Sequence, residues 1–357
     1  MTTPTIWERI TVLPKLLPLP FILGYNAFVS LFSSRDKPIA RILNERSVRY
    51  TTSVLTIPQL QWISPSTTET YRQWTRKHKL PELIEYTPEG VAIMWIGPKD
   101  AKDILFVAHG GGFMLPLTDF MLTFWSYVRR QLERQGHAIS VVFFEYSIYP
   151  NPFPVPLTQA CHALSFILET HSNAGIHLAG DSAGGNLILQ LFSHTLRPLL
   201  EPEVPVSPLT AAESRPRIKN VILISPWTSP GIPLPPRPNE RDVDIFTRRI
   251  MVEWGNIYIQ NTSPTYLPYM RFTDGFGDIA RYIPQARVYV FVGAREHLRD
   301  DGLGVYEALK GELGKDKVLL ELQRDGVHDD PMVHIAAGAQ ELNEVGNKMV
   351  DWLAVGL

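Results

Sequence analysis

A serine between glycines is the residue with the clearest chemical potential in this chain. Residues 180–184 read Gly-Asp-Ser-Ala-Gly, with Ser182 at the centre, between an apolar, β-rich run and a helix-like stretch. Glycines on both sides allow a sharp strand-to-helix turn that lifts the serine hydroxyl off a sheet. A helix starting there would also favour the negative charge that develops during attack on a carbonyl. The pattern predicts a nucleophile at Ser182.

A second glycine-rich segment could stabilise that negative charge. Residues 109–113 read His-Gly-Gly-Gly-Phe and follow another apolar run. Consecutive glycines let the backbone present bare N–H groups to an oxyanion, which is usually the largest single contribution to acyl-transfer catalysis. We assign the N–H groups of Gly111, Gly112 and Ala183 to this oxyanion hole, and His109 to organising the loop. A phosphate-binding loop is disfavoured because the Lys and Ser/Thr of a P-loop are missing.

The serine needs a general base, and the base needs an acid that orients it. For the base we favour His328, which follows the last apolar run in a loop, over His334, which lies six residues later in an expected helix. For the acid, Glu296, Asp300 and Asp301 compete. Glu296 is favoured because it lies nearest the end of its expected strand, whereas Asp300 could cap the following helix. The order serine, acid, histidine is the one used by α/β-hydrolases.

Short apolar runs that alternate with longer helix-like stretches must position these residues. Such alternation implies right-handed crossovers and an α/β fold with a mostly parallel sheet. The segment 226–285, rich in aromatic residues and proline, interrupts the alternation and is interpreted as an insertion above the sheet. The expected strands are 91–95, 104–108, 139–144, 176–179, 221–224, 288–292 and 318–322, and the expected helices are 120–135, 157–170, 186–196, 248–260 and 302–313.

The N-terminal region contains an uncharged stretch, residues 16–34. Its length is close to the roughly 20 residues that a bilayer-spanning helix needs. Pro18, Pro20 and Gly24 argue against one uninterrupted span. A cleaved signal peptide is disfavoured because the stretch begins late and no cleavage site follows it. Three interpretations stay open: a lid helix over a pocket, a helix lying on a membrane surface, or a membrane anchor.

The composition narrows the class of protein. The chain has 357 residues, 45% of them hydrophobic, as expected for a chain with a sizeable core. With 34 Lys+Arg and 36 Asp+Glu, the net charge is −2, which argues against a nucleic-acid partner. The one cysteine, Cys161, excludes an intrachain disulfide and a multi-cysteine metal site. We therefore expect no disulfide-bonded secreted protein but an intracellular one, either cytoplasmic or associated with the endoplasmic reticulum membrane.

Taken together, these motifs resemble the hormone-sensitive-lipase-like branch of the α/β-hydrolases. Three more segments contribute: 145–154 resembles that family's acidic-Tyr-x-Leu-Ala-Pro…Phe-Pro stretch, 223–227 its Ser-Pro-Trp corner, and 296–300 its acid-x-Leu-x-Asp segment. The resemblance covers roughly residues 90–335. Within the family, the segments 298–301 (Leu-Arg-Asp-Asp) and 326–328 (Gly-Val-His) and the apolar N-terminus are most similar to fungal steryl-acetyl-hydrolase-type esterases. The chain departs from the family at 148–149, Ile-Tyr for Leu-Ala, and at Glu296, where Asp is usual.

The resemblance implies an α/β-hydrolase fold with a helical cap from the N-terminal segment, residues 1–85, and from an insertion at about 226–285 of the catalytic domain, residues 86–357. It implies a serine carboxylic-ester hydrolase with no metal and no cofactor. The ester would join an acetyl or short-to-medium acyl group to a lipophilic alcohol. Phe113, Trp227 and Tyr258 are expected in the pocket wall.

Two other classes of function use the same motifs. The first is a repurposed hydrolase of natural-product biosynthesis, working as an acyltransferase, lyase or cyclase. The second is a receptor like the plant gibberellin receptors, which resemble this family but lack the catalytic histidine; the presence of Ser182, Glu296 and His328 argues against it. Whether the protein forms a homodimer is left open by the sequence.

Overall fold

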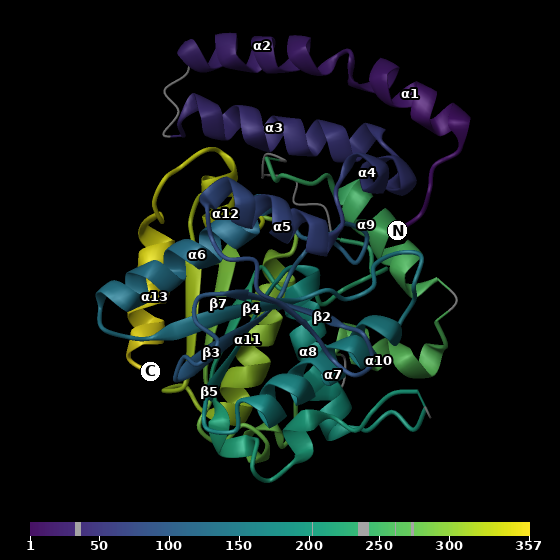
Figure 1. Ribbon diagram of the computed structural model, residues 1–357. Coiled ribbons are helices and arrows are strands. Elements are labelled where there is room, and N and C mark those ends of the chain that lie inside the picture. Colours follow the sequence, from purple (N-terminus) through teal and green to yellow (C-terminus); the bar gives the residue numbers. More distant parts are fainter. Residues whose placement is uncertain (33–36, 202, 235–242, 261, 273–274) are drawn as a thin grey trace.

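An eight-stranded sheet forms the centre of the computed structural model (Figure 1). The strand order is β1-β2-β4-β3-β5-β6-β7-β8; β1 and β2 run antiparallel to their neighbours, and the remaining pairs are parallel. This confirms the predicted mostly parallel α/β sheet. The structure describes residues 1–32, 37–201, 203–234, 243–260, 262–272 and 275–357. The strands are β1 Ile84–Tyr86, β2 Ala92–Ile96, β3 Asp103–Ala108, β4 Ile139–Phe144, β5 Gly175–Asp181, β6 Ile218–Ile224, β7 Arg287–Gly293 and β8 Val318–Gln323.

The central strands are continuous apolar runs because both of their faces are covered. In β3, Ile104 and Phe106 belong to one core cluster, whereas Leu105 and Val107 belong to the other, as the two-residue period of a strand requires. The first cluster packs under α7, α8 and α11, and the second under α6 and α13. These helices are α6 Asp119–Arg134, α7 Val155–Thr170, α8 Ala183–Leu196, α11 Arg299–Leu313 and α13 Glu344–Ala354.

The N-terminal segment forms helices that lie outside this core. In Figure 1, α3 lies above one end of the sheet and α2 lies outermost, on α3. The first helix ends at Leu16, Pro18 is the N-cap of the second, and Pro20 stands in the first turn of the second, where its missing N–H costs nothing. Most of the uncharged stretch 16–34 is therefore helical; its residues 33–34 lie outside the described residues. The helices are α1 Ile6–Leu16, α2 Leu19–Leu31, α3 Ile39–Val54, α4 Ile57–Ile63 and α5 Thr67–His78.

The expected insertion 226–285 contributes two more helices, α9 Arg248–Ile259 and α10 Leu267–Arg271. Its residues 235–242, 261 and 273–274 lie outside the described residues. Figure 1 shows α9 next to α4, so the insertion and the N-terminal segment meet on the same side of the molecule. The short helix α12, Asp330–Ala336, follows the loop of His328 and packs on both α3 and α6.

A buried ion pair joins the N-terminal helices to the loop that carries His328. Arg41 of α3 contacts Asp330 through Nη2 and Oδ2 at 2.6 Å, and its Nη1 donates to the backbone carbonyl of Asp330 at 3.1 Å. Arg41 also pairs with Glu45 at 2.6 Å. The Asp330 carboxylate in turn accepts hydrogen bonds from the Val327 N–H and the Gln323 amide. The orientation of α3 is therefore coupled to that of the loop that carries His328.

We expect Arg41→Ala to lower the free energy of unfolding by about 3–5 kcal/mol, because the Asp330 carboxylate would stay buried without its counter-charge. Urea denaturation followed by circular dichroism measures this change. The matched control is Arg72→Ala, which removes an exposed ion pair with Glu82 and should leave the midpoint almost unchanged. Equal midpoints for Arg41→Ala and the control would contradict the coupling.

Candidate active site

Ser182 stands at the sharp turn between β5 and α8. Its backbone has φ +50° and ψ −115°, a conformation that side chains rarely adopt, and its N–H donates to the carbonyl of Ile224 at 2.8 Å. Gly180 and Gly184 make the turn possible. A Cβ at Gly180 would collide with the carbonyl of Gly184, and a Cβ at Gly184 would collide with the carbonyl of Ala108. The turn therefore depends on the glycines that the sequence pattern singled out.

The structure brings Ser182, His328 and Glu296 together from three separate elements. The Nε2 atom of His328 lies 2.9 Å from the Ser182 hydroxyl, and its Nδ1 atom lies 3.1 Å from Oε2 of Glu296. All three side chains are buried. The second oxygen of Glu296 accepts the N–H of Gly293, the last residue of β7, at 3.1 Å. The carboxylate is thus fixed on one side by its own strand and on the other by the imidazole.

The competing residues lie elsewhere. Asp300 is at the start of α11, where its largely exposed carboxylate lies 3.3 Å from Arg299. Asp301 is buried, and its carboxylate accepts the Thr228 N–H and the Ser229 hydroxyl at 2.7 Å each, at the beginning of the insertion. His334 is in α12, as expected for a residue in a helix.

The glycine loop after β3 lies beside the nucleophile. The N–H of Gly110 donates to Oδ2 of Asp181, the residue before Ser182, at 2.9 Å. Gly111 and Gly112 have φ +110° and +64°, and both line the same cavity as Ser182. Within the described chain, the N–H groups of Gly111 and Gly112 are not engaged in a hydrogen bond. With Ala183, the first residue of α8, they offer N–H donors for an oxyanion.

His109 holds the loop from beneath. Its Nδ1 lies 2.7 Å from the carbonyl of Gly110, and its Nε2 lies 3.3 Å from the Thr67 hydroxyl. The ring stacks on Tyr146 at 4.4 Å. Burial lowers the pKa of His109 to about 4, so the ring is neutral at physiological pH. These contacts are those of a residue that organises the loop.

Four buried carboxyl groups surround His328, and they determine its charge. Burial alone would lower the pKa of His328, but the charges of Asp329 and Glu296 outweigh it and raise this pKa to about 10. Burial raises the pKa of Glu296, and it raises the pKa of Asp181 to about 7. The fourth carboxyl group belongs to Asp244.

A cavity of about 660 Å³ opens above Ser182 and His328. Residues of α3 line it on one side, and residues of the insertion line it on the other. Trp227 is in its wall, as expected. The apolar side chains of the wall include Val48, Trp227, Ile245, Phe246, Met251, Trp254 and Val333.

The expectation for Phe113 and Tyr258 is corrected by the structure. Their rings stack on each other at 4.0 Å and line a separate cavity of about 340 Å³. The reason is local: Phe113 has φ +59°, so the chain turns directly after Gly112 and the ring is buried in the core.

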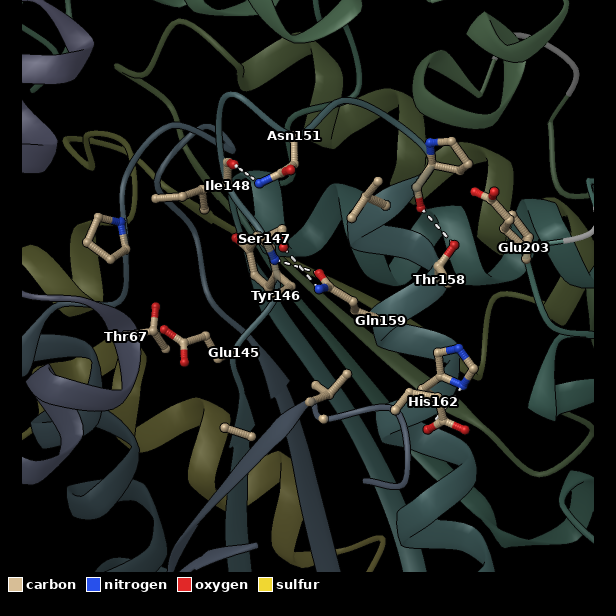
Figure 2. Close-up of a pocket in the computed structure, with 18 of the residues that line it drawn as sticks. Thr67, Glu145, Tyr146, Ser147, Ile148, Asn151, Thr158, Gln159, His162 and Glu203 are labelled. Atoms are coloured by element: carbon tan, nitrogen blue, oxygen red, sulfur yellow. Dashed lines mark hydrogen bonds and ion pairs between the residues drawn. The ribbon is translucent and has the colours of Figure 1, made fainter. Parts of the chain in front are cut away.

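A larger cavity, of about 800 Å³, lies elsewhere (Figure 2). Its wall includes polar side chains such as Glu145, Gln159 and His162. Neither Ser182 nor His328 lines it, and its side chains satisfy one another: Gln159 bonds both the N–H and the hydroxyl of Ser147 (Figure 2). We therefore assign the chemistry to the smaller, more apolar cavity.

Three polar residues of the site were missed by sequence reasoning. Asp244 accepts the N–H groups of Ile245, His297 and His328 at 2.8–2.9 Å, and so ties the insertion to both catalytic loops. Ser225 accepts the N–H of Asp329 at 3.0 Å. Asp329 follows His328 directly in the sequence, and this adjacency is the signal by which it could have been assigned to the site. Among the described residues, no group of three or more His, Cys, Asp or Glu could hold a metal ion.

A family model described as the alpha/beta hydrolase fold matches residues 105–329. The chain belongs to this α/β-hydrolase family. The matched part runs from β3 to the loop after β8 and includes Ser182, Glu296 and His328. A search of curated proteins finds no match.

Solved structures of similar fold include three α/β-hydrolases named as esterases or lipases. An esterase of the bacterial hormone-sensitive lipase family has a TM-score of 0.58 and 18% identity, and the match covers 90% of this chain and 98% of that one. A hyperthermophilic esterase of the archaeon Pyrobaculum calidifontis has a TM-score of 0.59 and 18% identity, and the match covers 89% of this chain and 96% of that one. A hormone-sensitive lipase from a metagenome library has a TM-score of 0.56 and 19% identity, and the match covers 84% of this chain and 96% of that one. At these identities the likeness shows the fold.

For this α/β-hydrolase, we expect Glu296→Gln to lower kcat/KM for an ester substrate by about 10⁴-fold, because an amide neither fixes the imidazole tautomer nor stabilises its cation. Steady-state kinetics on the purified variant measure the loss. Asp300→Asn, at the alternative acid, is the control and should keep wild-type kinetics. A greater loss in Asp300→Asn than in Glu296→Gln would reverse the assignment of the acid.

Proposed function

We propose that the protein is a carboxylic ester hydrolase that works through an acyl-enzyme on Ser182. The observation that carries the proposal is the hydrogen-bonded series from Glu296 through His328 to Ser182, at 3.1 and 2.9 Å. It lies at the floor of a largely apolar cavity, beside the N–H groups of Gly111 and Gly112, which make no hydrogen bond within the described part of the chain. Nucleophile, base and orienting acid within hydrogen-bond reach are the requirements for acyl transfer through serine.

The mechanism follows from the positions of these groups. Ser182 Oγ attacks the ester carbonyl while Nε2 of His328 takes its proton, and Glu296 stabilises the resulting imidazolium. The N–H groups of Gly111, Gly112 and Ala183 bind the oxyanion. His328 then gives the proton to the leaving alcohol. Water attacks the acyl-enzyme by the same route, and the released acid restores Ser182.

The cavity supports a lipophilic ester as substrate. Aromatic and aliphatic side chains of the insertion and α3 form much of its wall, and they would bury an apolar alcohol or acyl group. The resemblance to fungal steryl-acetyl-hydrolase-type esterases favours an acetyl or short-to-medium acyl group on a bulky lipophilic alcohol. The three similar structures named as esterases or lipases agree with ester hydrolysis in general.

We expect hydrolysis of p-nitrophenyl esters, tested from acetate to decanoate, with the highest kcat/KM at the short or medium chains. Ser182→Ala should reduce the rate by at least 10³-fold, and it should also abolish covalent labelling by a fluorophosphonate. Labelling without hydrolysis of any chain length would point instead to acyl transfer to another alcohol. A folded wild-type protein that is neither labelled nor active would contradict the proposal.

We also propose that α1 and α2 lie on a membrane surface. Together they form a helical stretch, Ile6–Leu31, that is long and apolar enough to cross a membrane by length and composition, and very little of it is buried in the protein. The residues of α2 carry no charge. The side chains of Asn26 and Ser30 bond to carbonyls of their own helix, so they offer few polar groups to solvent.

Eight of the exposed apolar side chains form one ridge, which we name the α1–α2 ridge. Its large apolar residues follow one another at intervals of three or four, so they lie on one face, while the opposite face packs on α3. Lys15, at the end of α1, points away and bonds Gln59 of α4. An uncharged ridge of this length suits the apolar part of a bilayer interface. The ridge consists of Ile6, Ile10, Leu13, Leu17, Phe21, Tyr25, Phe28 and Leu31.

We expect the protein to float with phosphatidylcholine vesicles in a density gradient, and the triple variant Leu17→Glu, Phe21→Glu, Phe28→Glu to stay at the bottom. Each charge removes an apolar insertion, and the bound-to-free ratio should fall by roughly tenfold or more per substitution. Leu200→Glu, at an exposed apolar residue far from the ridge in sequence, is the control. A wild-type protein that dimerises through the ridge and does not float would contradict the proposal.

A further inference from the structure

His328 has a carboxylate at each of its two ring nitrogens. Glu296 is at Nδ1, as in other serine hydrolases, but Asp329 is at Nε2, with its Oδ2 atom at 3.3 Å. The Nε2 atom is also the one that must take the proton of Ser182, whose hydroxyl lies 2.9 Å away. Asp329 and Ser182 therefore compete for the same nitrogen.

The backbone holds Asp329 in this position. Asp329 has φ +53°, in the left-handed region, and its N–H donates to the hydroxyl of Ser225 at 3.0 Å. Ser225 itself has φ +44°. The Asp329 side chain is about nine-tenths buried and lines the cavity above Ser182, and within the described chain its Oδ1 atom has no hydrogen-bond partner. A buried carboxylate oxygen without a partner is costly, so this arrangement is not one that packing alone would favour.

At this ion-pair distance, one proton shared by Nε2 and the Asp329 carboxyl group stabilises the contact. Two lone pairs at this distance would repel each other, so either the ring carries the hydrogen and donates it to the carboxylate, or the carboxyl carries it and donates it to the ring. In both cases the lone pair of Nε2 is occupied. His328 then cannot accept the proton of Ser182, and the site rests in an inactive form.

We infer that Asp329 is a positioning residue that withholds His328 from Ser182 by sharing a proton with Nε2, and that loss of this proton switches the site on. The inference rests on the proposed role of Ser182 and His328 in ester hydrolysis. When the shared proton leaves to solvent, Nε2 regains its lone pair and accepts the Ser182 hydroxyl hydrogen. The switch consists only of the release of this one proton to solvent; no other bond forms or breaks.

The surroundings of His328 favour retention of the proton. An anion on Asp329 or Glu296 stabilises a proton on the ring, and Asp244 adds to this, whereas burial opposes it. Burial also raises the pKa of Asp329 well above its usual value, so both partners hold the proton tightly. The polar groups and rings that face His328 from the elements packed around it are Ser182, Asp181, Asp244, Phe246, Glu296 and Asp329.

The first test titrates His328 directly and needs no turnover. Nitrogen-15 NMR of histidine-labelled protein, with His328 assigned from a His328→Gln sample, is followed from pH 5 to 10.5. In the wild type we expect the site to keep its proton to about pH 10. In Asp329→Asn and Asp329→Gly the titration should move down by roughly 1 to 3 pH units, because one adjacent charge is removed.

These two variants exclude different artefacts. Asparagine and glycine both tolerate a positive φ, so both should fold. Glycine removes the side chain completely and so excludes a new hydrogen bond from the asparagine amide to Nε2. Asp325→Asn, at an exposed carboxylate of the same loop, is the matched control and should titrate like the wild type. Titration of His328 at the wild-type pH in both Asp329 variants would overturn the inference.

The second test uses the rate. For p-nitrophenyl acetate, with the Ser182→Ala rate subtracted, wild-type kcat/KM should rise about tenfold per pH unit between pH 7 and 9, since it follows the free base. In the Asp329 variants the rise should level off earlier, and kcat/KM at pH 7 should increase about 10- to 1000-fold. A merely structural role would lower the rate at every pH. Absence of any hydrolysis would contradict the proposed function, while the NMR titration would still decide the role of Asp329.

Discussion

The concentration of buried carboxyl groups around one imidazole is the constraint on which the site depends. Asp181, Asp244, Glu296 and Asp329 all lie within the electrostatic reach of His328, and each needs hydrogen bonds to remain in the interior. Most of these bonds come from backbone N–H groups of the loops that form the site. The same contacts that satisfy the carboxylates therefore hold the loops, and the geometry of the base is a consequence of where negative charge is buried.

Asp244 illustrates this dependence. It receives three backbone N–H groups, from its own neighbour Ile245 and from the two loops of His297 and His328. The insertion that supplies Asp244 thereby fixes both loops that carry the acid and the base. Asp181 does the same for the glycine loop through Gly110. Removing the Asp244 or the Asp181 carboxylate would leave backbone N–H donors unpaired, so charge and loop conformation cannot be changed independently at these two residues.

What could be predicted from the sequence is what depends on local chemistry. The strands were predictable because they are apolar runs covered on both faces, and the turn at Ser182 was predictable because its glycines cannot be replaced without collision. The choice of Glu296 over Asp300 as the acid was possible because Glu296 lies nearer the end of its strand, β7. By contrast, Asp244 is connected to His328 through contacts between segments far apart in the chain, which no local pattern records. The strand β1 is only three residues long, too short to give a periodic signal.

The expectation that Phe113 and Tyr258 line the cavity of Ser182 was wrong because it, too, depends on contacts between distant segments. Phe113 and Tyr258 are large and aromatic, and near the glycine loop such residues suggest a pocket wall. The direction of each side chain, however, depends on one backbone angle at Phe113 and on packing between α9 and the loop. Composition can indicate that a residue is buried, but it cannot tell whether the surface that buries it is the core or the cavity.

The N-terminal helices connect the site to the outside of the molecule. The helices α1 and α2 pack on α3 through the face opposite the ridge, and α3 lines the cavity. Arg41 of α3 pairs with Asp330, which follows Asp329 directly. A displacement of α3 toward or away from the body would therefore act on the loop of His328 through a buried ion pair, because separating the pair would leave a buried charge without its partner. A helix that lies on a bilayer is restrained by it. Contact of the ridge with lipid would therefore also restrain α3, and with it the cavity wall and the loop that carries His328. Arg41 therefore connects α3, on which α1 and α2 pack, to the residue that follows Asp329.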